Sequence, residues 1–314
     1  MKHKGKIIVC AALVLAVGVA ALVFYRRPPV LVLSDEPFTF LYGTRRTKMR
    51  QMAASLALGR RVKQVLIDDA VGTDLMVLAL EEAEPRPWRA VFPYRYAEGA
   101  LRYHEQYPDI PTILLYGRDS PDRRTQAAAS NLGESALFFE FSTDRKLDLY
   151  RTGRFAAALA REKTGIIPVF INRSNMNAGK DAFLQGFGSD IPELEAQFFE
   201  TIARFNLSGD FPLVVIAGSG SEYLDRNPKS PLILFTWLDP SFTSKETLII
   251  MDDSVWAQLG DALKMVKEGK KSGLIPSKPL IFSARIADNK ILRDLKKAAR
   301  SAMEGDTEPS LAAP

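Results

Sequence analysis

The stretch RAVFPYRYAEGALRYHEQYPDIPTILLY, residues 89–116, decides the fold class of this chain. An apolar run at residues 89–92 is followed by a helical pattern from Tyr96 to Tyr107, and a second apolar run follows at residues 111–116. Strand-length apolar runs separated by a helix-length segment are typical of a β-α-β unit, whose two strands lie parallel in one sheet. We therefore expect an α/β fold with a parallel sheet.

The same alternation continues toward the N-terminus. Strands and helices are expected in turn at residues 30–33, 47–58, 64–67 and 75–82. The helix at residues 47–58 carries Met49, Met52, Ala53 and Leu56 at helical spacing. Together with residues 89–116, these elements give four strands and three helices, which make one doubly wound lobe.

A second series follows and predicts a second doubly wound lobe. Its strands are expected at residues 136–141, 166–171, 213–216, 232–235 and 247–250. Its helices are expected at residues 147–163, 175–187 and 254–268, the last with Val255, Leu259, Leu263 and Val266 buried. Residues 194–199 fit a strand, but too few residues separate them from Leu213 for a crossover helix. A helix over residues 191–205 is the alternative.

The N-terminal segment has the length and charge pattern of a membrane span. Residues 7–24 carry no charge, and the flanking charges are Lys2, Lys4, Lys6, Arg26 and Arg27. Eighteen such residues can cross a bilayer. The apolar run continues past Ala20, a conceivable cleavage site, which favours an uncleaved anchor over a signal peptide. We expect one span through the inner membrane, a cytoplasmic N-terminus and a periplasmic main domain.

The charge balance argues against a nucleic-acid partner. The net charge of +5 comes entirely from the five residues that flank the span, and the rest of the chain holds 37 basic and 37 acidic residues. A neutral domain offers no global electrostatic attraction for DNA or RNA. A local cluster is interpreted as a solvated helix face: Arg45, Arg46, Lys48, Arg50, Arg60, Arg61 and Lys63. The only cysteine, Cys10, lies in the span, so the exported part must depend on a buried core.

The residues that catalysis most often needs are scarce. His3 and His104 are the only histidines, so neither a Ser-His-Asp triad nor a metal site with several histidines is available. His104 is expected on a helix surface. The glycine-rich residues 218–221 lack the lysine of a phosphate loop. We predict no enzymatic activity, no metal and no cofactor.

Polar and aromatic residues gather instead just past the ends of the expected strands, where open α/β sheets bind ligands. The predicted ligand-binding residues are Asp35, Phe38, Phe40, Tyr94, Tyr116, Asn172, Ser219, Trp237 and Asp239. Aromatic rings supply stacking faces, and carboxylates and amides bind hydroxyls or ring nitrogens.

Three motifs in the second half carry a family resemblance. They are YRTGRFAAALA at residues 150–160, KTGIIPVF at residues 163–170 and NAGKDAFLQGF at residues 177–187. The last resembles a helix of the basic membrane protein family, which ends in a Phe-x-x-Gly-Phe pattern, and the chain is similar to this family over about residues 30–300. The family's Asp-x-Ser-Phe-Asn segment is replaced here by SDEPFTF at residues 34–40, and its lipoprotein cysteine is missing.

The resemblance implies a type I periplasmic-binding-protein fold and a domain plan. Residues 1–28 form the anchor or signal segment, residues 29–303 the two-lobed ligand-binding domain and residues 304–314 a disordered tail. The first lobe covers about residues 29–120 and the second about residues 135–250, with C-terminal segments returning across the hinge. The implied function is the receptor of an ABC-type uptake system for a small polar or nucleoside-like ligand, with an ABC permease as partner. The alternative is a structural or envelope-assembly protein that kept the fold and binds no ligand.

Overall fold

The computed structural model describes residues 15, 18–19, 21–35, 44–68, 72–93, 96–116, 137–171, 176–188, 193–200, 210–217, 223–224, 229–235 and 245–303. The chain divides into two compact units. Unit 1 consists of residues 1–115, 122–140 and 264–271, and unit 2 consists of residues 116–121, 141–263 and 272–314. The predicted tail at residues 304–314 lies outside the described residues.

The first sheet has the strand order β11-β5-β4-β3-β1-β2. Its strands are β1 (Val30–Asp35), β2 (Val62–Ile67), β3 (Arg89–Pro93), β4 (Thr112–Tyr116), β5 (Phe138–Thr143) and β11 (Ser272–Ile275). β1 pairs in parallel with β2 and β3, and β3 pairs in parallel with β4. The four apolar residues that begin β1 have no exposed surface, as expected for a central strand of a sheet covered on both faces. The four strands predicted for the first lobe are confirmed.

β5 belongs to a different sheet from the one expected. The sequence pattern placed residues 136–141 at the start of the second series, but β5 lies in the first sheet beside β4. The backbone amide of Thr112 donates to the carbonyl of Leu137 at 2.9 Å, just before β5 begins. An apolar pattern indicates that a strand is buried but not which sheet it joins, so this assignment was wrong.

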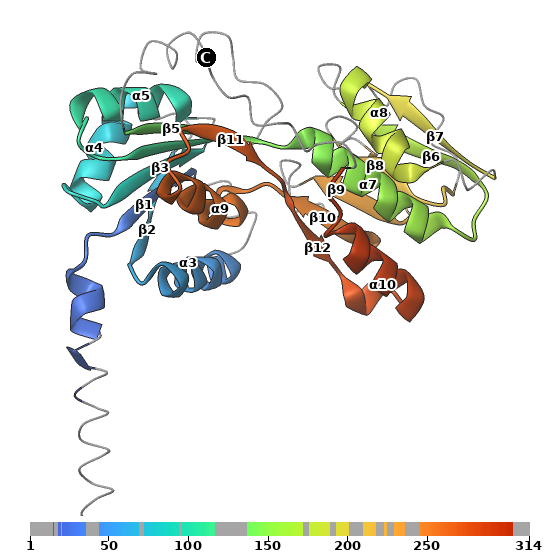
Figure 1. Ribbon diagram of the computed structural model, residues 1–314, viewed down its shortest axis with the longest axis horizontal. Helices are drawn as coiled ribbons and strands as arrows, with labels where there is room; N and C mark the ends of the chain where they lie inside the picture. Colours follow the sequence, from blue (N-terminus) through green and yellow to red (C-terminus); the bar gives the residue numbers. More distant parts are fainter. Residues whose placement is uncertain are drawn as a thin grey trace, which may run out of the picture. The chain divides into compact units, whose positions relative to one another are not determined.

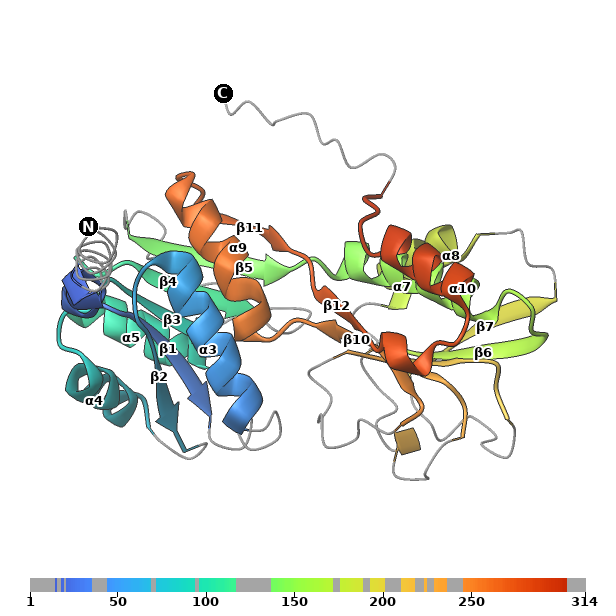
Figure 2. The ribbon, with the colours of Figure 1, turned by 90° about the horizontal axis from the view of Figure 1, so that it is seen from below.

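Helices lie on both faces of the first sheet (Figures 1 and 2). α4 (Thr73–Ala83) and α5 (Ala97–Gln106) lie together on one face, and α3 (Thr44–Leu58) lies on the other. α4 buries Met76, Val77 and Leu80 against the sheet. The apolar stripe of α3, in contrast, is exposed.

His104 on α5 corrects a second expectation. Its side chain is buried, with only 2 % of the residue exposed, and its ring lies 5.4 Å from the ring of Phe138. Burial lowers the pKa of His104, because the protonated ring would have to leave water. The prediction of a surface residue was wrong because α5 buries an unusually wide face, which includes Ala97, Gly99 and Tyr103.

The second sheet has the strand order β12-β10-β9-β8-β6-β7. Its strands are β6 (Gly165–Phe170), β7 (Leu194–Phe199), β8 (Val214–Ile216), β9 (Leu232–Phe235), β10 (Thr247–Asp252) and β12 (Lys278–Ile281). Only the pairing of β12 with β10 is antiparallel among the described pairs. β7 decides the question left open at residues 194–199, because it is a strand parallel to β6. Residues 200–213, which connect β7 to β8, are long enough for a parallel crossover, so the objection that too few residues separate the two strands was wrong.

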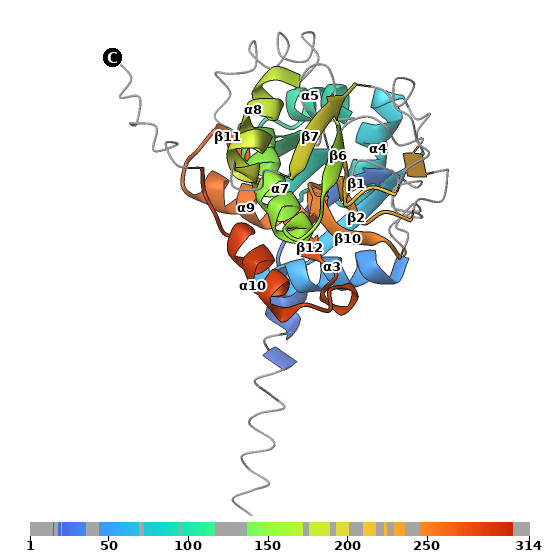
Figure 3. The same ribbon diagram turned by 90° about the vertical axis from the view of Figure 1, so that its right-hand side faces the viewer.

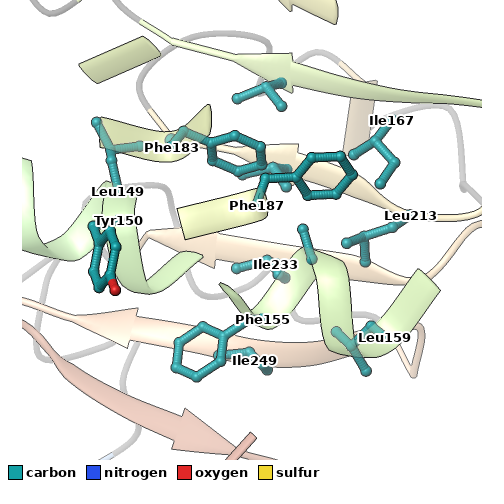
Figure 4. Packing of buried hydrophobic residues seen from close by; sticks show 14 of the residues in the cluster. Leu149, Tyr150, Phe155, Leu159, Ile167, Phe183, Phe187, Leu213, Ile233 and Ile249 are labelled. Carbon is teal, nitrogen blue, oxygen red and sulfur yellow. The ribbon is translucent and has the colours of Figure 1, made fainter. Parts of the chain in front are cut away.

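Three helices lie side by side on one face of the second sheet (Figures 1 and 3): α7 (Arg145–Ala160), α8 (Met176–Phe187) and α10 (Asn289–Ala298). Figure 4 shows how the core closes, with Phe155 from α7 and Phe183 and Phe187 from α8 packed over Ile233 and Ile249 of the strands. All five side chains are buried.

Two glycines allow α7 and α8 to approach closely. A methyl group on Gly153 would overlap the carbonyl oxygen of Phe183, and one on Gly186 would overlap the carbonyl oxygen of Tyr150. The two helix backbones therefore touch through glycines, one on each helix. Gly186 is the glycine of the Phe-x-x-Gly-Phe pattern, so that motif describes helix packing.

The chain passes between the two sheets three times. The first passage follows β5, which leads to α7, and the second follows β10, which leads through α9 (Val255–Lys267) to β11. The third joins β11 to β12. The four residues predicted to be buried on α9 are buried, so that prediction is confirmed. β11, β12 and α10 had no counterpart in the sequence analysis.

The predicted span at residues 7–24 lies largely outside the described residues. Within the described part of the chain, no helix is both long enough and apolar enough to cross a membrane.

Candidate ligand-binding loops and crossover cluster

The first group of predicted site residues follows the strands of the first sheet. Because β1, β3 and β4 are parallel, their carboxyl ends lie at the same edge of the sheet. Asp35 is the last residue of β1, and Tyr116 is the last residue of β4. The side chains of these two residues, and the whole of Phe38, Phe40 and Tyr94, lie outside the described residues. Their convergence on one ligand stays a prediction.

The second group follows the neighbouring strands β6, β8 and β9 of the second sheet. These strands are parallel and end at Phe170, Ile216 and Phe235, so their carboxyl ends share one edge. The predicted site residues come two to four positions later and also lie outside the described residues: Asn172, Ser219, Trp237 and Asp239. The described strands thus carry the predicted loops at one edge of each sheet.

Buried polar side chains in unit 2 join all three passages between the sheets. Arg145, at the start of α7, pairs with Asp253, which follows β10, and lies 3.6 Å from the carboxylate of Asp148. Asp148 accepts a 2.8 Å hydrogen bond from the amide of Ser277, which lies between β11 and β12, and a second from its hydroxyl. We call Arg145, Asp148, Asp253 and Ser277 the crossover cluster.

Further hydrogen bonds hold the same segments. The side-chain amide of Gln258 on α9 donates to the hydroxyl of Thr143 at 2.9 Å, and both side chains are buried. The amide of Asp144 donates to the carbonyl of Ile275 at 3.0 Å. The Asp144 carboxylate accepts from the amide of Leu147 at 2.9 Å and so caps α7. The first turn of α7 is therefore fixed to the other two passages.

The crossover cluster is electrostatically coupled. Complete burial raises the pKa of Asp148 to about 7, although Arg145 and the hydrogen bonds from Ser277 act in the opposite direction. The guanidinium of Arg145 also lies 5.3 Å from the ring centre of Phe235, the last residue of β9. Asp148 has no exposed surface, and its contacts are with Arg145 and Ser277, so the cluster links the segments that cross between the sheets.

Sequence reasoning missed this cluster. Asp144 and Asp148 carry a local signal, because acidic residues at the start of a helix favour its N-terminus. Their partners carry none, since Asp253 and Ser277 lie 108 and 129 residues away along the chain from the residues they bind.

A cavity of about 700 Å³ in unit 2 lies elsewhere. It is lined by α7, α8 and α10, by Lys163, which lies two residues before β6, and by Glu193, which immediately precedes β7. The cavity is therefore at the amino edge of the second sheet, opposite the predicted loops. An ion pair between Arg161 and Asp294, at 3.2 Å, lies on its wall. In the described part of the chain, no group of three or more His, Cys, Asp or Glu side chains could hold a metal ion.

No protein-family model and no curated protein matches the chain. Solved structures do share its fold. An ABC transporter solute-binding protein from Conexibacter woesei aligns at a TM-score of 0.56 and 11 % identity, over 87 % of this chain and 95 % of that protein. A periplasmic solute-binding protein of an ABC transporter from Actinobacillus succinogenes, solved with D-allose, aligns at 0.50 and 12 % identity, over 82 % and 99 %.

The chain has the periplasmic-binding-protein fold of type I. A transcriptional activator of the comK gene from Bacillus halodurans aligns equally well, at a TM-score of 0.51 and 13 % identity, over 86 % of this chain and 95 % of that protein. Proteins of different roles therefore carry this periplasmic-binding-protein fold, so the fold alone does not determine the function of the chain.

Proposed function

We propose that this chain is a membrane-anchored periplasmic solute receptor, the binding component of an ABC-type uptake system, and is not an enzyme. The observation that carries the proposal is the alignment of parallel strand ends at one edge of each sheet, with aromatic, amide and carboxylate residues in the sequence that follows. That edge is where ligands bind in open α/β sheets. The fold shared with the Conexibacter woesei solute-binding protein supports the same role.

The ligand class that we propose is a small polyhydroxylated ring compound. Aromatic rings at Phe38, Phe40 and Trp237 suit the face of a sugar or a base, and the carboxylates of Asp35 and Asp239 suit hydroxyl groups. The Actinobacillus protein was solved with D-allose, and the resemblance to the basic membrane protein family implies a nucleoside. A ring that carries several hydroxyls is common to both.

We place the receptor in the inner membrane through residues 7–24, with the main domain in the periplasm. The residues that directly follow this segment form hydrogen bonds with the rest of unit 1. Arg27 donates through Nη1 to the carbonyl of Gly59 at 3.3 Å, and Arg60 donates to the carbonyl of Pro28 at 3.3 Å. The full-length protein should stay with the membrane after extraction at alkaline pH. A mature N-terminus at Ala21 would contradict the anchor.

The test of the receptor begins with the purified full-length protein in detergent. Denaturation followed by mass spectrometry identifies any small molecule that purifies with the chain. Calorimetric titration with a panel of aldoses and nucleosides then distinguishes the two ligand sources. Binding of neither class would contradict the receptor and favour the ligand-free envelope protein.

A matched pair of tryptophan variants tests the loop assignment. Trp237→Ala should weaken binding by roughly 1–3 kcal/mol, the scale for burial and stacking of one aromatic ring, and Phe38→Ala should do the same. Trp88 lies at the opposite edge of the first sheet, and the guanidinium carbons of Arg60 and Arg89 lie 4.4 and 4.1 Å from its ring centre. Trp88→Ala should lower the melting temperature and leave affinity unchanged. If Trp237→Ala instead lowers the melting temperature and leaves affinity unchanged, Trp237 is not part of the binding site.

A further inference from the structure

Helix α3 has an apolar face that no described element covers. Met49, Met52 and Leu56 are 61 %, 63 % and 71 % exposed, and the alanines at positions 53 and 57 are exposed beside them. Spacings of three and four residues place all five on one side of the helix. A continuous apolar stripe of this kind on a surface helix marks a surface that contacts something else.

The opposite face fixes the orientation of α3. The side-chain amide of Gln51 donates to the carbonyl of Val62 at 2.7 Å, and the amide of Val62 donates to the hydroxyl of Ser55 at 2.9 Å. Both bonds attach α3 to the first residue of β2. A rotation that buried the apolar stripe would break them, so the outward direction of the stripe follows from specific contacts.

The end of α3 lies where the chain leaves the proposed anchor. Besides the bond from Arg27 to Gly59, the guanidinium carbon of Arg61 lies 5.9 Å from the ring centre of Tyr25, the residue that follows the apolar segment. At a rise of about 1.5 Å per residue, Met49 lies only about 15 Å from Gly59 along the axis of α3. Figures 1 and 3 show α3 and the helix at residues 21–26 on the same side of the first sheet, with α4 and α5 on the other.

The segment of the chain that contains α3 carries only positive charges. Residues 37–67 contain seven Lys and Arg and no Asp or Glu. Lys48 on α3 and Lys63 on β2 are exposed. Apolar side chains insert into the headgroup layer of a membrane, and basic residues are attracted to its anionic phosphates.

We propose that α3 lies on the anionic phospholipid surface of the membrane that holds residues 7–24, with Met49, Met52 and Leu56 in the headgroup layer. The inference rests on the anchor of the proposed function and extends it, because it adds a second membrane contact and fixes how unit 1 faces the bilayer. The short connection to the anchor keeps α3 at a high effective concentration near this surface, an advantage that no free partner has. The basic residues lie near the lipid phosphates.

The experiment uses the full-length chain with Cys10 replaced by Ser and one reporter cysteine. Leu56→Cys and Leu75→Cys are a matched pair, because both leucines are exposed, at 71 % and 60 %, and both belong to unit 1. Each is labelled with an environment-sensitive fluorophore and reconstituted in phosphatidylglycerol-containing vesicles. The label at position 56 should emit at shorter wavelength than in detergent and should be protected from iodide, and the label at position 75 should show neither change. Neutral phosphatidylcholine vesicles or high salt should abolish the protection, as should Met52→Glu but not Leu78→Glu.

Three results would overturn the proposal. Equal iodide access at positions 56 and 75 in anionic vesicles would show that α3 does not touch lipid. Equal protection in neutral vesicles would show that the basic residues have no part. Protection in detergent that weakens on dilution would assign the stripe to a second copy of the chain. Vesicle flotation tests the anchor separately, because a chain that does not float has no anchor and loses this contact with it, and titration of sugars and nucleosides on the same samples reports the receptor function.

Discussion

Replacing Arg145 by Met removes the only described cation of the crossover cluster and keeps much of the side-chain volume. Arg145 pairs with Asp253 and faces the fully buried Asp148, so its loss removes a buried cation from beside two buried carboxylates. Removal of one partner from a buried ion pair costs about 3–5 kcal/mol. At roughly 2–4 °C per kcal/mol for a domain of this size, the melting temperature should fall by about 6–20 °C.

The same helix supplies a matched control. Arg161 follows the end of α7 and pairs with Asp294 at 3.2 Å, but both side chains are substantially exposed, at 51 % and 36 %. A surface pair contributes about 0–1 kcal/mol, so Arg161→Met should change the melting temperature little. Thermal unfolding of both variants, followed by circular dichroism, gives the comparison. If Arg145→Met lowers the melting temperature no more than Arg161→Met does, the crossover cluster does not stabilise the fold.

The effect of Arg145→Met should also depend on pH. Arg145 favours the ionised form of Asp148, whose pKa is about 7, so their attraction is present above that pH and is lost as Asp148 takes up a proton below it. The stability difference between the wild type and Arg145→Met should therefore be larger at pH 8 than at pH 5.5. A difference that does not change with pH would mean that the two side chains are not coupled.

Three further variants test other parts of the structure. Gly153→Ala should destabilise unit 2 by about 1–3 kcal/mol in chemical denaturation, because a methyl group would overlap the backbone of α8. In the control Gly260→Ala on α9, nothing lies within 4 Å of the added methyl group, and the free energy of unfolding should rise by up to about 1 kcal/mol. Equal effects of the two substitutions would contradict the close approach of α7 and α8. Burial raises the pKa of Asp148 from 3.8 to about 7, so the folded chain keeps a proton that the unfolded chain releases, and the free energy of unfolding should fall as pH rises through this window. Asp148→Asn should flatten that slope in denaturation curves between pH 4 and 8, and an unchanged slope would refute the assignment. Burial lowers the pKa of His104 below its ordinary value of 6.5, so acidification below pH 6.5 favours the unfolded chain. The variant His104→Phe should therefore lose less stability than the wild type between pH 7.5 and pH 5. Equal losses would show that His104 does not take up a proton on unfolding.

Strand and helix positions were accessible from the sequence because they depend on local periodicity. The apolar runs that became β1, β3, β4, β6 and β9 are buried in the strands where they were expected, and α9 buries its predicted face. Residues 194–199 show the limit of this signal. Their pattern suits a strand or a helix, and only pairing with β6 made them β7.

The candidate site divides in the same way. The sequence indicated which loops follow strand ends, and the sheet order placed β1, β3 and β4 as neighbours, and likewise β6, β8 and β9. The crossover cluster was invisible, since an ion pair such as Arg145 with Asp253 depends on where the folded chain brings two distant segments together. Local patterns do not encode that distance.

Hydrophobic periodicity by itself determined that this is an α/β chain with two sheets, and the N-terminal charges and apolar run determined the predicted anchor. Tertiary structure alone decided that β5 joins the first sheet, that His104 is buried and that the stripe of α3 faces outward. The physical reason is that a local pattern records which side chains leave water, whereas strand order and helix orientation depend on contacts between residues far apart in the chain. The hydrogen bonds of Gln51 and Ser55 with Val62 fix the orientation of α3 on the sheet. The spacing of its apolar residues could not have predicted which way they face.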